Sequence, residues 1–190
     1  DLGVAFKMKR AQTLIGVNYY NFLFKWDVNH DNFTDVTLQN RVSVFNKWNF
    51  TRTNGRQATL ALRYIYENRY GGEMQWTKEY RGSDSIYGES IYTQRVEAIG
   101  VYQLPVRESF FIDYSYNFHF QDSYYGTIKY LAKQHVAFAQ LRWNKTINKF
   151  SLSAGVPFRF IYYDDNTPAT TADDLIKNKP SYTFLPGIFT

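Results

Sequence analysis

One stretch of the chain decides its fold: Phe110-Phe111-Ile112-Asp113-Tyr114-Ser115-Tyr116-Asn117-Phe118-His119-Phe120-Gln121-Asp122. Large apolar side chains occupy every even position from 110 to 120, and polar side chains occupy the odd positions from 113 to 121. A period of two places each set on its own side of an extended strand, whereas the helical period of about 3.6 would mix them. The stretch is therefore predicted to be a β-strand with one apolar and one polar face.

The same alternation recurs on both sides of this stretch. It runs through residues 14–26, 36–50, 58–70, 92–104, 134–147 and 150–162, with a short run at residues 3–9. We therefore expect about eight antiparallel strands, with a ninth beginning near Tyr182. The runs reach about 13 residues, compared with about 5 to 6 for an average strand in a soluble domain. Crossing a bilayer at a tilt takes about 9 to 11 residues, so the length favours strands that span an outer membrane.

The composition agrees with two-faced strands and excludes several other classes of protein. Aromatic residues make up 19% of the chain, yet the mean hydropathy is −0.47, so rings and polar groups must be separated by position. No cysteine is present, which excludes a disulfide framework and a thiolate site. No stretch approaches the roughly 18 apolar residues of a membrane-spanning helix. The net charge of +5 comes without a nucleic-acid-binding motif, so no nucleic-acid partner is expected.

The connections between the predicted strands alternate in length and in charge. Short turns are expected near residues 9–12, 53–57, 105–109 and 147–149, and long loops at residues 27–35, 76–90, 122–134 and 164–181. The short turns are basic (Lys7, Lys9, Arg10, Arg52, Arg56, Lys145, Lys149), and the long loops are acidic (Asp31, Asp35, Asp84, Glu89, Asp122, Asp164, Asp165, Asp173, Asp174). Outer-membrane barrels have short periplasmic turns and longer extracellular loops. The pattern predicts an antiparallel transmembrane β-barrel of this kind.

An unpaired strand edge in hydrocarbon costs several kcal/mol for each backbone group, so a membrane barrel must close. Residues 184–190 look like the start of a further strand. We therefore expect residues 1–190 to form a partial barrel domain, with about eight to nine strands of a larger barrel.

Several strings in the predicted loops resemble a group of TonB-dependent outer-membrane receptors from Bacteroidota. These strings are Gly71-Gly72-Glu73-Met74-Gln75-Trp76, Tyr87-Gly88-Glu89-Ser90-Ile91-Tyr92, Tyr130-Leu131-Ala132-Lys133-Gln134, Tyr162-Tyr163-Asp164-Asp165-Asn166-Thr167-Pro168-Ala169-Thr170 and Leu185-Pro186-Gly187-Ile188-Phe189. The resemblance covers essentially the whole chain.

The resemblance implies a barrel of the 22-stranded type, closed by a plug domain that receives energy from the TonB complex. Such receptors import scarce, bulky nutrients, and this chain looks closest to those for cobalamin or ferric siderophores. The chain departs from the full plan because the plug, the TonB box and the remaining strands are absent from its 190 residues. The expected function is therefore active import of such a nutrient at the bacterial outer membrane, in contact with its lipids. The transport mechanism is implied by the resemblance alone.

One predicted loop carries the spacing of a calcium site. Oxygen ligands are expected from Asp27, Asn29, Asp31, the backbone carbonyl of Phe33, and Asp35, because calcium takes six to eight hard oxygens. Asn32 replaces the usual glycine and Leu38 replaces the usual bidentate glutamate. The alternative is a hairpin loop in which Asp and Asn bond their own backbone. A second ion among Asp164, Asp165, Asp173 and Asp174 is a further hypothesis.

Tyrosines in or beside the predicted long loops form the candidate ligand-binding set: Tyr80, Tyr87, Tyr124, Tyr125 and Tyr130. Aromatic side chains there would hold a flat ligand. The alternative role for such residues is the aromatic girdle at a membrane interface.

Two other functions remain open alongside import. The strand pattern alone is also typical of a passive porin or a structural barrel. The acidic, aromatic loops are compatible with docking of a surface lipoprotein. Catalysis is not expected, because no motif fixes a nucleophile beside a base, and Glu67 and Glu97 among Arg63, Arg69 and Arg95 indicate ion pairing.

Overall fold

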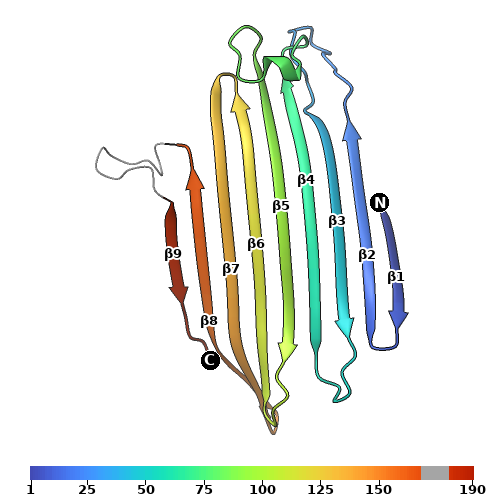
Figure 1. Cartoon of the computed structure of the whole chain (residues 1–190), viewed down its shortest axis with the longest axis vertical. Helices are drawn as coiled ribbons and strands as arrows, with labels where there is room; N and C mark the ends of the chain where they lie inside the picture. Colours follow the sequence, from blue (N-terminus) through green and yellow to red (C-terminus); the bar gives the residue numbers. More distant parts are fainter. Residues whose placement is uncertain (168–179) are drawn as a thin grey trace, which may run out of the picture.

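The computed structural model describes residues 1–167 and 180–190, and these form a single open sheet of nine antiparallel strands (Figure 1). Each strand is hydrogen-bonded to the next in chain order, from β1 to β9. The strands are β1 Leu2–Met8, β2 Ala11–Phe22, β3 Leu38–Phe50, β4 Ala58–Gly72, β5 Gly88–Gln103, β6 Ser109–Tyr125, β7 Ile128–Ile147, β8 Phe150–Asp165 and β9 Ser181–Pro186, and a short 3-10 helix, η1, spans Lys78–Tyr80. The prediction of an all-β chain of antiparallel strands is confirmed.

Connections at the two ends of the sheet differ in length. One end, the turn end, carries the connections β1–β2, β3–β4, β5–β6 and β7–β8. The opposite loop end carries the long connections β2–β3 and β4–β5 and the two-residue turn β6–β7 (Figure 1). The described residues contain no helix of the length and hydropathy needed to pass through a membrane.

The prediction of a long loop at residues 122–134 is wrong. Strand β6 continues to Tyr125 and β7 begins at Ile128, so two residues join them, and Asp122 pairs with Leu131 inside the ladder. Gly126 has φ +58°, a backbone conformation that glycine adopts without a steric penalty and that tight hairpins require. The sequence suggested a loop because polar residues occur on both faces at this end of the strands, so the alternation is lost there.

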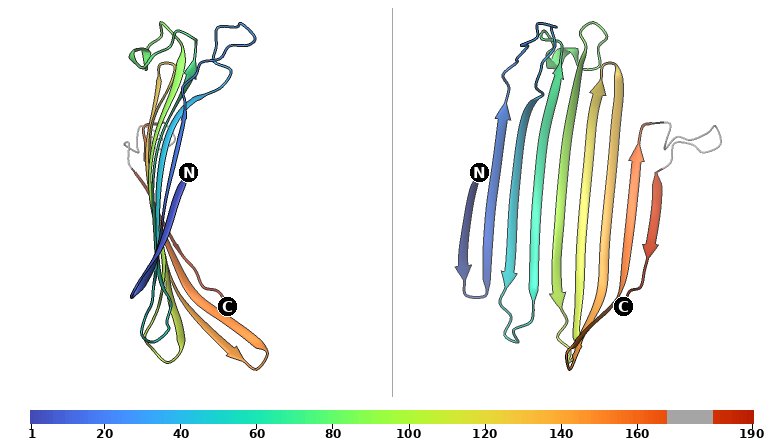
Figure 2. Two further views of the ribbon diagram at one scale, coloured as in Figure 1. Left: turned by 90° about the vertical axis from the view of Figure 1, so that its right-hand side faces the viewer. Right: turned by 180° about the vertical axis from the view of Figure 1, so that it is seen from behind.

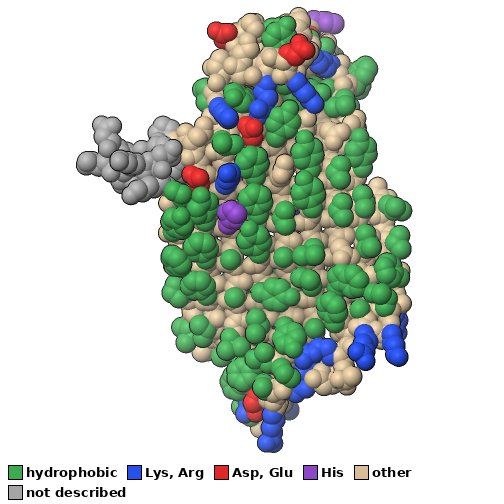
Figure 3. Space-filling view, viewed as in Figure 1, with side chains coloured by type: hydrophobic (Ala, Val, Ile, Leu, Met, Phe, Trp, Pro, Cys, Tyr) green, Lys and Arg blue, Asp and Glu red, His purple; other side chains and the backbone are tan. Residues whose placement is uncertain are grey.

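Alternation along each strand builds one continuous apolar face across the sheet. The register places one residue of each strand directly opposite the next in a row of Leu2, Val17, Val44, Tyr64, Val96, Phe118, His135, Tyr162 and Tyr182. Figure 3 shows this apolar face, with hydrophobic side chains over its middle and Lys and Arg at both the turn end and the loop end. The opposite, polar face carries the other alternating set, which includes Arg41, Arg63, Glu97, His119 and Arg142.

The apolar face has no second layer of the described residues against it. Seen edge-on, the sheet is one twisted layer (Figure 2). Among the described residues only four apolar side chains are buried, Ala11, Leu38, Trp76 and Ala132, whereas Val96, Val156 and Phe184 on the apolar face are among many that are exposed. A soluble domain buries the apolar face of its sheet against another layer. The fold therefore presents an apolar surface larger than a chain in water normally exposes.

Candidate functional site

The two long connections at the loop end are bound to each other by backbone hydrogen bonds. The amide of Thr34 donates to the carbonyl of Gly72 at 2.9 Å, and the amide of Met74 donates to the carbonyl of Asn32 at 2.8 Å. The hydroxyl of Thr34 in turn accepts from the amide of Gly72 at 3.1 Å. The β2–β3 loop thus continues the pairing of β4 beyond the end of β3.

Side chains reinforce this junction. The ammonium of Lys25 donates to the carbonyls of Met74 at 2.7 Å and Trp76 at 2.8 Å. The ring of Trp76 is 3% exposed, lies 5.4 Å from the ring of Tyr70, and packs on the backbone of Gly88. A Cβ at position 88 would overlap the indole, so only glycine leaves room for it. The two loops therefore form one packed unit.

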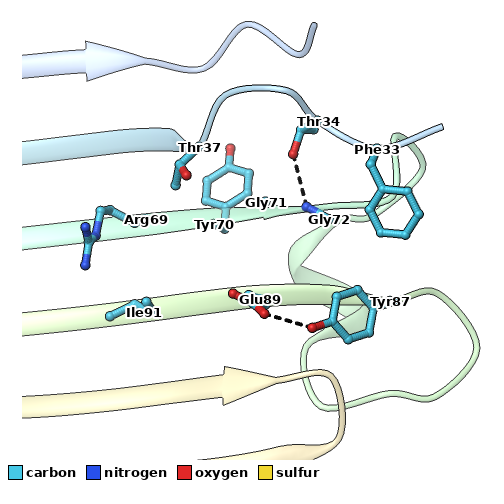
Figure 4. Close-up of a pocket in the computed structure, with 10 residues that line it drawn as sticks. All are labelled: Phe33, Thr34, Thr37, Arg69, Tyr70, Gly71, Gly72, Tyr87, Glu89 and Ile91. Carbon is cyan, nitrogen blue, oxygen red and sulfur yellow. Dashed lines mark hydrogen bonds between the residues drawn. The ribbon is translucent and has the colours of Figure 1, made fainter. Parts of the chain in front are cut away.

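A pocket of about 320 Å³ lies between these loops and the ends of β4 and β5 (Figure 4). Its lining combines three aromatic residues, two opposite charges, hydroxyls and an aliphatic side chain: Phe33, Thr34, Thr37, Arg69, Tyr70, Gly71, Gly72, Tyr87, Glu89 and Ile91. Arg69, Glu89 and Ile91 belong to the polar face, because Arg69 pairs with Ile91 and Gly71 pairs with Glu89 across β4 and β5. The pocket opens on the polar face at the loop end.

The polar groups of the pocket are held in fixed positions. The phenol of Tyr87 donates to the Glu89 carboxylate at 2.8 Å, and the backbone amide of Tyr87 donates to Glu73 at 2.7 Å. The bond to the Glu89 carboxylate raises the pKa of the Tyr87 phenol, because ionisation would lose the bond and set two negative charges side by side. The ring of Phe33 lies 6.3 Å from the ring of Tyr87. An aromatic pair thus stands beside a carboxylate.

The five tyrosines of the candidate ligand set do not form one cluster. Tyr87 lines the pocket, and Tyr125 lies opposite Glu89 at the end of β6. Tyr80 ends η1, and Tyr130, within β7, shares a 3.0 Å hydrogen bond with Tyr163. Tyr124 lies within β6 on the apolar face. Sequence reasoning missed Arg69, Glu89, Thr34 and Thr37 as pocket residues, and it assigned only the backbone carbonyl of Phe33, as a calcium ligand.

A cation clamp that the sequence did not reveal holds the β4–β5 loop to the apolar face. The guanidinium of Arg81 lies 4.6 Å from the ring of Tyr92 and 4.4 Å from that of Tyr124. It also donates to the hydroxyl of Ser90 at 2.8 Å and to the carboxylate of Asp122 at 2.9 Å. The ring of Tyr124 therefore has a structural role, because it packs against the guanidinium of Arg81.

The predicted calcium loop uses its acidic side chains to bind backbone amides. The Asp27 carboxylate accepts from the amides of Asp31 at 3.1 Å and Asn32 at 2.9 Å, and that of Asp35 accepts from Val28 at 2.7 Å. Asn32 has φ +69°, as expected where asparagine replaces glycine. Within the described residues, no three His, Cys, Asp or Glu side chains gather as a metal site. Calcium at this loop stays a prediction, and Asp173 and Asp174 of the second hypothesis lie outside the described residues.

Several charged residues of the polar face pair with each other. Glu97 lies 2.6 Å from Arg63 and 3.6 Å from Arg95, and Glu67 lies 3.6 Å from Arg69. Farther toward the turn end, the Arg142 guanidinium donates to both oxygens of Asp113, at 2.8 and 3.0 Å. The predicted ion pairing of Glu67 and Glu97 is confirmed.

Comparisons with family models, with curated proteins and with solved structures find no match to this chain.

Proposed function

We propose that this chain is part of the wall of an outer-membrane receptor that imports a bulky nutrient, cobalamin or a ferric siderophore, with TonB-derived energy. One observation carries the membrane part of the proposal: an apolar face runs unbroken over nine strands, and a charged face lies behind it. Lipid would cover the first face, and a water-filled lumen would hydrate the second.

Strand length supports the same location. Strands β5 to β8 have 16, 17, 20 and 16 residues, whereas a tilted strand needs about 9 to 11 to cross the hydrocarbon. The excess residues would extend beyond the bilayer on one side. The basic turns and the longer loops then fall on opposite sides of the membrane, as in outer-membrane barrels.

Both edges of the sheet support a larger barrel. Strands β1 and β9 each pair with one neighbour among the described residues, and each leaves one row of backbone groups without a strand partner. Such edges are costly in hydrocarbon, so further strands would close the wall. The likeness of the loop strings to TonB-dependent receptors supports an importer over other large barrels, and the pocket supplies a place where a ligand makes contact.

A passive pore is the second candidate function, and one observation favours it. Arg41, Lys47 and Arg159 stand on the polar face without a carboxylate within 4 Å among the described residues, so a lumen lined by them would attract anions.

One experiment separates the two functions. The full-length protein that carries this chain is expressed in a bacterium whose own cobalamin receptor is deleted, with and without TonB, and cobalamin uptake is measured. Uptake that requires TonB is the expected result. Anion conductance in planar bilayers without TonB-dependent uptake would favour the passive pore and contradict import.

A further inference from the structure

We propose that the pocket between the β2–β3 and β4–β5 loops binds a neutral, hydroxylated sugar ring, either free or as part of a larger nutrient. This inference rests on the proposed function in one respect, namely that the polar face at the loop end is open to ligands from outside the cell. It names the chemical class of ligand that the pocket recognises.

Size limits what the pocket can hold. Its volume of about 320 Å³ lies near the lower end of the roughly 300 to 1,000 Å³ typical of small-molecule sites. A whole corrin or a ferric siderophore would overfill it, whereas one or two sugar rings would fit. A larger nutrient would therefore place only a ring-sized part in this pocket.

Charge indicates that this part is neutral. The charged side chains of the lining are one guanidinium, Arg69, and one carboxylate, Glu89, whose formal charges cancel. A site for an anionic catecholate or a phosphate would need an excess of cations. Hydroxyl groups suit this pair, because one hydroxyl donates to the carboxylate while a neighbouring one accepts from the guanidinium.

The rings of Phe33 and Tyr87 supply the remaining feature of such a site. Phe33 is 41% and Tyr87 45% exposed, although the packed loop unit fixes the backbone of both. Figure 4 shows both rings at the loop end of the pocket, with Arg69 and Ile91 farther along the strands. The C–H face of a sugar packs on an aromatic face while its hydroxyls reach polar groups at the rim.

The test uses the full-length protein in detergent and two kinds of probe in calorimetric titrations. The methyl glycosides of glucose, galactose and mannose are free sugar rings, and cyanocobalamin carries a ribose within a larger nutrient. Glycine and inorganic phosphate serve as charged controls. Binding of at least one glycoside would assign the pocket to free sugars, and binding of cyanocobalamin alone would assign it to a carried ring.

Variants tie the binding to the pocket. Phe33→Ala and Glu89→Gln are each expected to lower the affinity for the probe by about tenfold, because they remove a stacking ring or a charged acceptor. Phe24→Ala is the matched control, since Phe24 lies in the same loop, is exposed, and does not line the pocket. Failure of every sugar-bearing probe to bind, equal affinity in all variants, or tighter binding of glycine or phosphate would overturn the proposal.

Binding and transport give separate answers. TonB-dependent uptake of cobalamin, in a protein whose affinity for every sugar-bearing probe is the same with and without Phe33→Ala, would retain the proposed function and refute the sugar pocket. Sugar binding that Phe33→Ala weakens, without TonB-dependent uptake, would retain the pocket and refute energised import.

Discussion

The guanidinium of Arg81 lies 2.9 Å from the carboxylate of Asp122, although 41 residues separate them in the chain. Both side chains are mostly shielded from water, at 19% and 27% exposed. Their contact ties the β4–β5 loop to β6, two strands away from β4. The loop that carries Tyr87 and borders the pocket is therefore anchored on the far side of the wall.

Arg81→Ala is expected to loosen the β4–β5 loop. The change removes charge-assisted hydrogen bonds and two ring contacts, which together stabilise the loop by about 2 kcal/mol. Hydrogen exchange at residues 73–87 should quicken by roughly one order of magnitude or more, with little change in the strands. Lys78→Ala removes the same charge from an exposed position in the same loop, and similar exchange in both variants would contradict the clamp.

Gly88→Ala is expected to expel Trp76 from its buried position. The added methyl group would overlap the indole, and overpacking of this kind costs about 1 to 3 kcal/mol. Hydroxyl-radical footprinting should then detect increased oxidation of Trp76. Gly16→Ala is a suitable control, because the nearest atom to its new Cβ lies 3.9 Å away. An indole that stays protected in Gly88→Ala would show that the loops adjust without opening.

Arg142→Ala is expected to cost about 1 to 3 kcal/mol of stability, because Asp113 would lose two charge-assisted bonds and keep one, from Gln140. Arg159→Ala on the same face should cost less, since that guanidinium only lies over the Phe138 ring at 5.9 Å. Denaturant titration of both variants, with Asp113→Ala and the double variant, gives the coupling energy of the pair. A coupling near zero would show that the polar face hydrates these charges fully.

Asp27→Ala is expected to loosen residues 27–35 at a cost of about 1 kcal/mol, because the amide of Asn32 would lose its acceptor and that of Asp31 would keep only Asn29 Oδ1, at 3.3 Å. Hydrogen exchange of this segment measures the effect, with Asp84→Ala in the other loop as the control. Repeating the measurement with calcium tests the calcium prediction. Slower exchange in calcium that is lost in Asp27→Ala would support an ion site. The same exchange rate with and without calcium would mean that the acidic side chains only accept hydrogen bonds from backbone amides.

Alternation predicted most of the sheet, because a period of two is visible wherever one face is apolar. It failed at residues 122–134. Gln121, Asp122 and Ser123 are consecutive polar residues, so the alternation is lost there although the pairing of β6 and β7 continues. The pocket could not be predicted for a different reason. Arg69 and Glu89 line the same pocket because Arg69 pairs with Ile91 and Gly71 pairs with Glu89, and alternation does not specify which residue of one strand faces which residue of the next. The Arg81 clamp likewise depends on three separate segments.

Two positions of β5, on opposite faces of the sheet, test the membrane proposal most directly. Val96 lies on the apolar face and Ile99 on the polar face of β5, and both are exposed in the sheet, at 40% and 60%. In a bilayer, arginine near the middle of the lipid-facing side costs about 2 to 4 kcal/mol, whereas a wet lumen accepts it at little cost. Val96→Arg should therefore lower the stability of the full-length protein in lipid vesicles by that amount, and Ile99→Arg should leave it nearly unchanged. Equal effects of the two substitutions in a denaturant titration would mean that lipid does not cover the apolar face, and the proposed location would fail.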